Sequence, residues 1–148
     1  MKVKICGITN IEDGLAAAQA GADFLGFNFY PQSPRYVTVA EAGAIVAAVR
    51  RQFRQAAPLG VGVFVNATPE QVRYTLYTAG LAYAQLHGDE TPADIAAQRG
   101  RAYKALRPAT LQAALEEVDL FGALGPADGP GLLVDAYHPA LYGGSGQV

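Results

Sequence analysis

Two residues able to move protons lie near opposite ends of this chain, each in a short apolar segment. Cys6, the only cysteine, belongs to the segment 3–8, and Asp135 ends the segment 132–135. A thiolate can take a proton and a carboxylic acid can give one, so the two could act as base and acid across a pocket. Whether they meet depends on the elements between them.

Each of these residues also has a simpler interpretation. A lone cysteine is often a small buried hydrophobe, and an aspartate after a strand often caps the next turn. Cys6 can act as a base only as a thiolate. Lys4, on the same side of a strand, and the amides of a following helix would favour that form. Asp135 can act as the acid only when protonated, which apolar surroundings or a nearby negative charge would favour.

The composition indicates a folded protein that handles a small molecule. Hydrophobic residues make up 51% of the 148 residues and charged residues 16%, which excludes a disordered chain and suits one domain over residues 1–148. The net charge is −2 and Lys and Arg form no long run, so no nucleic-acid partner is expected. No apolar run approaches the roughly 20 residues that span a membrane, and a single cysteine suits a reducing compartment, so we expect a cytoplasmic protein.

Segments with strand-like and helix-like patterns alternate along the chain. The apolar runs that predict strands are 3–8, 24–29, 59–65, 82–86, 102–106 and 132–135. Helices are predicted between them, over 11–20, over 39–53, from 69, from 92, and over 111–118. Their expected N-caps are Thr9 or Asn10, then Thr38, Thr68, Thr91 and Thr110. The stretch 121–131, rich in Gly, Pro and Ala, is expected to be an exposed loop.

This alternation predicts a parallel sheet, either a doubly wound open sheet or a (β/α)8 TIM barrel. The first predicted strand is not followed by the glycine-rich loop of a dinucleotide-binding sheet. The strand ends instead carry varied polar residues, as in a barrel that builds a site at its carboxyl end. These residues are Cys6, Asn28, Asn66, His87, Arg107 and Asp135. A full barrel needs at least roughly 200 residues, so we expect about six of its strand–helix units here and an incomplete C-terminus.

Five motifs stand in order at the ends of these strands. They are Lys4-Ile5-Cys6-Gly7-Ile8-Thr9, Ser33-Pro34-Arg35-Tyr36, Gly62-Val63-Phe64-Val65-Asn66, Gln85-Leu86-His87-Gly88-Asp89-Glu90, and Asp135 followed by Gly143-Gly144-Ser145-Gly146. Together they resemble the phosphoribosylanthranilate isomerase family of tryptophan biosynthesis, over the whole chain. One departure is Gln32, which stands where a basic residue is expected.

The resemblance implies a (β/α)8 barrel that performs an Amadori rearrangement without a cofactor or metal. Its substrate would be N-(5-phosphoribosyl)anthranilate and its product 1-(o-carboxyphenylamino)-1-deoxyribulose 5-phosphate. By similarity, Cys6 would be the general base and Asp135 the general acid. Arg35, which could otherwise be a surface arginine, would bind the anthranilate carboxylate through two parallel hydrogen bonds.

Two further candidates could contact the substrate. His87 is either a wall of the pocket or a histidine held by backbone partners. A segment near the C-terminus is either an ordinary loop or a lid whose backbone amides close on the ligand. Its residues are Gly143, Gly144, Ser145 and Gly146. The two histidines and one cysteine lack the spacing of a metal site, so no metal is expected.

Two other functions fit the same pattern. One is a different phosphosugar-binding barrel enzyme, although a histidine-pathway isomerase would need a carboxylate in place of Cys6. The other is an inactive barrel fragment that acts only with another chain, or that associates with itself through the open edges of its sheet. The family's phosphate-binding loops follow strands seven and eight, so the 148-residue chain alone is expected to be inactive.

Overall fold

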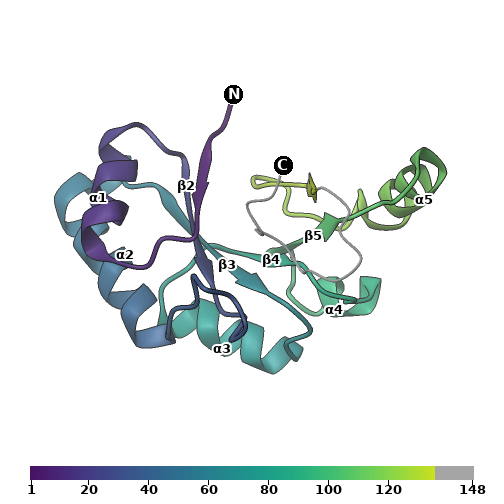
Figure 1. Ribbon diagram of the computed structural model, residues 1–148, viewed down its shortest axis with the longest axis horizontal. Helices are drawn as coiled ribbons and strands as arrows, with labels where there is room; N and C mark the ends of the chain where they lie inside the picture. The colour runs from purple at the N-terminus through teal and green to yellow at the C-terminus, as the bar shows by residue number, and fades with distance from the viewer. Residues whose placement is uncertain (136–148) are drawn as a thin grey trace.

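The computed structural model describes residues 1–135, in which parallel strands and helices alternate (Figure 1). The strands are β1 (Lys4–Cys6), β2 (Phe24–Asn28), β3 (Leu59–Phe64), β4 (Tyr83–Leu86), β5 (Ala102–Leu106) and β6 (Leu132–Val134). The helices are α1 (Ile11–Gln19), α2 (Val39–Phe53), the 3-10 turn η1 (Arg54–Ala56), α3 (Pro69–Thr78), α4 (Pro92–Ala96) and α5 (Leu111–Phe121).

The order of the strands decides between the two predicted architectures. The six strands pair in sequence order, β1-β2-β3-β4-β5-β6, and every pairing is parallel. A doubly wound sheet reverses its strand order at a switch point, whereas here each connection moves one strand further in the same direction. Because such connections are right-handed, they place the helices on one face and leave the other face to become a barrel interior. The described residues therefore form six strands of a barrel wall, as predicted.

The predicted helix starts are confirmed by their caps. Asn10 accepts a hydrogen bond from the Asp13 amide at 2.8 Å and begins α1. Thr38, Thr68 and Thr91 each form a capping box with the residue three positions on, while Thr110 accepts from the Ala113 amide. These bonds satisfy amides that the first turn of a helix leaves unpaired, so each helix begins at a defined residue.

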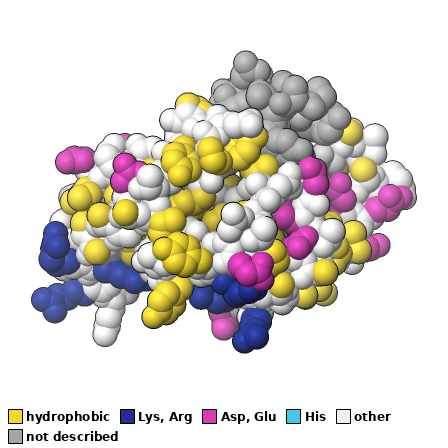
Figure 2. All heavy atoms as spheres, turned by 90° about the horizontal axis from the view of Figure 1, so that it is seen from below, with side chains coloured by type: hydrophobic (Ala, Val, Ile, Leu, Met, Phe, Trp, Pro, Cys, Tyr) yellow, Lys and Arg dark blue, Asp and Glu magenta, His cyan; other side chains and the backbone are white. Residues whose placement is uncertain are grey.

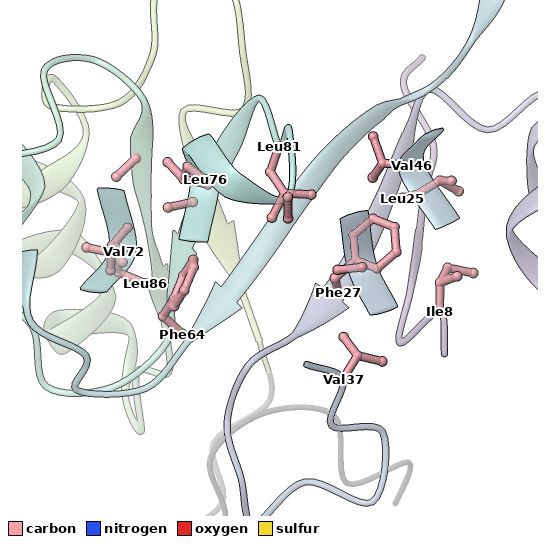
Figure 3. Close-up of a cluster of buried hydrophobic side chains, with 14 of the residues drawn as sticks. Ile8, Leu25, Phe27, Val37, Val46, Phe64, Val72, Leu76, Leu81 and Leu86 are labelled. Atoms are coloured by element: carbon pink, nitrogen blue, oxygen red, sulfur yellow. The ribbon is translucent and has the colours of Figure 1, made fainter. Parts of the chain in front are cut away.

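The strands alternate between two different faces, because successive strand residues point to opposite sides. The outer face carries the apolar core beneath the helices, with Leu25 and Phe27 of β2 and Leu86 of β4 close to fully buried. Figure 3 shows these side chains facing residues of the helices, among them Val46 and Leu76. The inner face carries Lys4, Cys6, Asn28, Gln85 and Tyr103, whose side chains are polar and partly joined by hydrogen bonds.

Two boundaries differ from the predictions by more than one residue. Strand β1 ends at Cys6 because Gly7 turns the chain with a φ of 84°, a conformation that favours glycine. Helix α5 continues to Phe121, which is 8% exposed, so the start of the expected exposed loop is wrong. Burial of the Phe121 ring against the core explains this extension, which the local Gly and Pro content did not predict.

The Lys and Arg side chains are spread over the visible surface (Figure 2), as expected for a sequence without a long basic run. On the face seen in Figure 2, Lys and Arg side chains lie in separate groups among hydrophobic and uncharged ones. Among the helices of residues 1–135, none is long and apolar enough to cross a membrane.

Candidate functional site

A pocket of about 240 Å³ opens at the carboxyl ends of the strands. Its polar lining comes from β1, β2, β4, the end of β6 and the loop after β2. The lining residues are Lys4, Cys6, Asn28, Tyr30, Arg35, Val63, Val65, Gln85, His87, Leu133 and Asp135.

Cys6 is the last residue of β1 and its side chain is exposed to this pocket. It pairs in register with Gly26 of β2, where an added Cβ would lie 2.7 Å from the Cys6 sulfur and 2.9 Å from Lys4 Cε. Gly26 therefore leaves the space that the thiol and the lysine stem occupy. The interpretation of Cys6 as a buried hydrophobe is wrong.

Lys4 lies beside Cys6 and enters a polar chain that crosses the inner face. Its ammonium group donates to Gln85 Oε1. Burial lowers the pKa of Lys4, and the interaction with Cys6 opposes that shift. An ammonium group in this place is a natural counter-charge for a thiolate.

Arg35 reaches the same pocket from the loop after β2. Asn28 and Ser33 brace this loop: the Asn28 amide donates to Ser33 Oγ at 3.0 Å, and Ser33 Oγ accepts from the Arg35 amide at 3.2 Å. The Arg35 guanidinium then lies over Gly7 and donates to the Cys6 carbonyl at 3.3 Å. Because an added Cβ at Gly7 would come within 2.6 Å of Arg35 Cδ, the glycine is what lets the arginine approach Cys6.

Gln85 joins Lys4 to His87, which extends the polar chain to Asp135. Tyr103 OH donates to Gln85 Oε1 at 3.0 Å, and Gln85 Nε2 lies 2.9 Å from His87 Nδ1. On the other side of the ring, His87 Nε2 lies 3.3 Å from Asp135 Oδ2, although without the geometry of a hydrogen bond. Side chains from β1, β4, β5 and the end of β6 thus form one continuous path.

The electrostatic surroundings keep His87 uncharged near neutral pH. Burial lowers the pKa of His87, Asp135 opposes this shift, and the positive charges of Arg107, Lys104 and Lys4 add to it. Burial also raises the pKa of Tyr103, so its hydroxyl remains a neutral donor. The path from Lys4 to Asp135 therefore contains a neutral imidazole.

The loop that carries His87 is anchored by a buried ion pair. Lys104 Nζ lies 3.1 Å from Glu90 Oε2 and donates to the Gly88 carbonyl at 2.6 Å. Glu90 in turn accepts from the amides of Asn66 and Gly88, both at 2.8 Å. Asn66, whose φ is 54°, also accepts from the Asp89 amide at 2.7 Å. These contacts fix the loop that follows β4 and so fix the position of His87 in the pocket wall.

The structure brings four of the predicted site residues together: Cys6, Arg35, His87 and Asp135 all line the pocket. The His87 ring contacts the Gln85 side chain, while the His87 main-chain amide donates to the Phe64 carbonyl. Asn66 and Arg107, predicted only as strand ends, lie at the same end of the sheet but do not line the pocket. The predicted lid residues, Gly143, Gly144, Ser145 and Gly146, lie outside the described residues.

Sequence reasoning missed Gln85, Tyr103 and Lys104 as parts of the site. The signal was available, because each is a polar residue inside an otherwise apolar strand. Such a residue is stable there only with hydrogen-bond partners, and so indicates a polar network. Within residues 1–135, no cluster of three or more His, Cys, Asp or Glu could hold a metal ion.

Comparison with known proteins places the chain in a family. The family described as "N-(5'phosphoribosyl)anthranilate (PRA) isomerase" matches residues 3–148. The chain belongs to the PRA isomerase family. It is 47% identical over 150 residues to the N-(5'-phosphoribosyl)anthranilate isomerase of Azotobacter vinelandii, with 99% of the chain and 66% of the relative covered. The isomerase of Acinetobacter calcoaceticus is 42% identical over 150 residues, covering 99% of the chain and 67% of the relative.

Solved structures of PRA isomerases give the same result. The isomerase of Thermotoga maritima superposes with a TM-score of 0.82 at 34% identity, covering 99% of this chain and 66% of that one. A second, in complex with reduced 1-(o-carboxyphenylamino)-1-deoxyribulose 5-phosphate, has a TM-score of 0.78 at 32% identity, covering 93% and 66%. The chain thus spans about two thirds of the length of these relatives.

Proposed function

We propose that this chain carries the acid–base centre of a PRA isomerase. It would convert N-(5-phosphoribosyl)anthranilate to 1-(o-carboxyphenylamino)-1-deoxyribulose 5-phosphate, a step of tryptophan biosynthesis. One observation carries the proposal: Cys6, at the end of β1, and Asp135, directly after β6, line one pocket together with Arg35. Membership of the family and the product analogue held by a solved relative support the same substrate class.

The reaction needs an acid first and a base second. Asp135 gives its proton to the ring oxygen of the ribose as the C1′–O bond breaks, and the anthranilate nitrogen forms a Schiff base. The Cys6 thiolate then removes the proton from C2′, and the resulting enolamine tautomerises to the ketose. The Lys4 ammonium beside Cys6 stabilises the thiolate charge before this proton transfer.

Among the described residues, Arg35 is the one that orients the substrate. Its guanidinium can bind the anthranilate carboxylate through two parallel hydrogen bonds, and its position over Gly7 places the aromatic ring near Cys6. The phosphate of the substrate needs a second site. In barrels of this class that site follows strands seven and eight, beyond the six strands described here.

For this reason we propose that residues 1–148 alone do not catalyse the reaction at a detectable rate. Without the phosphate contacts, binding energy cannot hold C2′ between Cys6 and Asp135. The test measures the loss of substrate fluorescence with residues 1–148 alone and with the C-terminal third of a relative supplied as a second chain or by fusion. Saturable, Cys6-dependent turnover by residues 1–148 alone would show that the phosphate is bound elsewhere.

The acid and base assignments are tested in the fused barrel. Cys6→Ala and Asp135→Ala should each reduce kcat by about 100-fold to 10,000-fold, the usual contribution of a positioned proton-transfer group. Leu133→Ala is the matched control, since Leu133 lines the same pocket without a group that transfers protons. Circular dichroism should show the same fold in every variant. Turnover by Cys6→Ala close to that of the parent would refute the base assignment.

A second candidate function is a barrel fragment that works only in association with another chain. The two outer strands of the described sheet, β1 and β6, favour it, because an unpaired strand edge invites association. Sedimentation of residues 1–148 is the test. A monomer with a sharp thermal transition would count against association, whereas a defined oligomer would support it.

A further inference from the structure

The polar path across the inner face has a direction, set by which groups can only donate hydrogen bonds. We propose that Gln85 is a positioning residue that holds His87 in the tautomer protonated at Nε2, so that His87 stabilises the Asp135 carboxylate formed after proton transfer. This inference rests on the proposed role of Asp135 as the general acid, and it assigns roles to Gln85 and His87 that neither motif nor pocket alone specifies.

The orientation of the Gln85 amide follows from Lys4. An ammonium group has donors and no acceptor, and it contacts Gln85 Oε1, which also accepts from Tyr103 OH at 3.0 Å. A flipped amide would set its NH2 group against the ammonium, donor against donor. Gln85 Nε2 therefore faces His87, as the structure places it.

The tautomer of His87 follows from the amide. Gln85 Nε2 lies 2.9 Å from His87 Nδ1 and can only donate, so Nδ1 must accept with its lone pair. Burial and the surrounding positive charges hold the pKa of His87 below its ordinary value, which keeps the ring neutral. A neutral imidazole with an accepting Nδ1 carries its single proton on Nε2.

The proton on Nε2 lies close to the proposed acid. The imidazole is 5% exposed, and Nε2 finds no hydrogen bond of regular geometry among residues 1–135 while lying 3.3 Å from Asp135 Oδ2. A buried N–H without a partner is costly, and its bond to a carboxylate is stronger than to a carboxylic acid. The contact therefore strengthens as Asp135 gives its proton to the ribose ring oxygen. A contact of this kind lowers the barrier, because it favours the state after transfer over the state before it.

The opposite tautomer would work against the reaction. With the proton on Nδ1, the Nε2 lone pair would face Asp135, repel its carboxylate and hold the acid's proton away from the substrate. Gln85→Glu creates this case with little change in size. The new carboxylate still accepts from Lys4 and Tyr103, but it also accepts from His87, which draws the proton to Nδ1.

The first measurement is the tautomer itself, read from the ¹⁵N shifts of both imidazole nitrogens in the fused barrel. His87 is assigned with a His138→Gln variant. We expect a protonated Nε2 in the parent and in Tyr103→Phe, which leaves Lys4 to orient the amide. In Gln85→Glu we expect a protonated Nδ1 or a doubly protonated ring. A protonated Nδ1 in the parent overturns the proposal, whether or not any variant folds.

The second measurement is turnover against pH. Gln85→Glu should lower kcat about tenfold to 100-fold, the size of a hydrogen bond to a charged group, while KM stays within about threefold. The pH profile should also move on the limb that reports the acid. The groups facing His87 that could contribute to this shift are Asp135 after β6, Arg107 and Lys104 of the β5 region, and Lys4 of β1. Unchanged kcat and pH profile in Gln85→Glu overturn the proposal.

The two proposals fail in different ways. If Asp135→Asn retains turnover, the proposed acid is wrong, and the proposed function of this site fails with it. If Asp135→Asn abolishes turnover while Gln85→Glu leaves it unchanged, the acid stands and the role of Gln85 and His87 is refuted.

Discussion

Both faces of the sheet contain almost fully buried side chains, but the two faces differ in chemistry. On the outer face Phe27 is 0% exposed and Leu25 1%, while on the inner face Tyr103 is 1% exposed and Gln85 3%. Burial therefore does not separate the core from the site, whereas polarity does. The outer face is stabilised by removing apolar surface from water, and the inner face is stable only because its polar groups satisfy one another.

This difference explains why the same strands can serve both stability and chemistry. On β4, Leu86 packs outward against the helices while Gln85 and His87, on either side of it, point into the pocket. A substitution on one face should consequently change stability, and a substitution on the other should change catalysis.

The largest loss of stability is expected from truncating the outer core. Phe27→Ala should lower the free energy of unfolding by about 3–5 kcal/mol, because Phe27 is fully buried beneath α2 and the site can collapse only in part. Urea unfolding followed by circular dichroism measures this. Val63→Ala, on the pocket side of β3, is the matched control and should cost less, because water can enter the space it leaves. Equal costs would contradict the separation of the two faces.

A smaller loss of stability is expected when the buried ion pair that anchors the His87 loop is broken. Glu90→Gln should cost about 3 kcal/mol, the lower end for breaking a buried pair, because the amide keeps one accepting oxygen for the backbone. Lys104→Met combined with Glu90→Gln should recover part of this loss, since the uncompensated ammonium is then gone. Glu70→Gln, in an exposed pair with Arg73, is the control and should leave the urea midpoint unchanged. No recovery in the double variant would mean that Glu90 acts mainly through the amides of Asn66 and Gly88.

Arg35 should affect binding rather than stability. In the fused barrel, Arg35→Ala should raise KM by about tenfold to 100-fold, the size of a lost hydrogen bond to a charged group, with kcat nearly unchanged. The anthranilate carboxylate is bound in the ground state and the transition state alike, so both lose the same contact. Arg35→Lys should have a KM between those of the parent and Arg35→Ala, since lysine keeps the positive charge but cannot form two parallel hydrogen bonds. A fall in kcat at constant KM would instead show that Arg35 acts through its bond to the Cys6 carbonyl.

The sequence predicted the wall of the barrel well because its signals are local. Each cap lies within three residues of its partner, as at Thr38 and Glu41, and each strand is a short, mainly apolar run. The prediction was wrong at Phe121, whose burial is decided by long-range packing that no local composition contains.

The site was predictable only in part for a related reason. Cys6, Arg35, His87 and Asp135 carry groups whose chemistry is evident from their residue types and motifs. Gln85 and Tyr103 act through hydrogen bonds to residues on other strands, and those partners are known only once the strand order and register are known. Polar residues inside apolar strands indicate that such partners exist, but not which ones.

The smallest expected effect concerns the amino end of the sheet, where Asp23 ties the chain start to β2. Its carboxylate accepts from Lys2 Nζ and from the Val3 amide, both at 2.7 Å, and these bonds lower the pKa of Asp23. A carboxyl group whose folded pKa is below its ordinary value of 3.8 stabilises the fold above that value, and the contribution disappears as pH falls through the folded pKa. We therefore expect the urea midpoint of the parent to decrease at pH below about 4, and to decrease less in Asp23→Asn.

Glu41 and Asp94 have lowered pKa values for the same reason, through bonds from Thr38 and Thr91, so the decrease should be reduced rather than abolished. Since these groups lie far from the pocket, Asp23→Asn should leave kcat unchanged, and a changed kcat would contradict the separation between the part of the sheet that holds the fold and the part that holds the site.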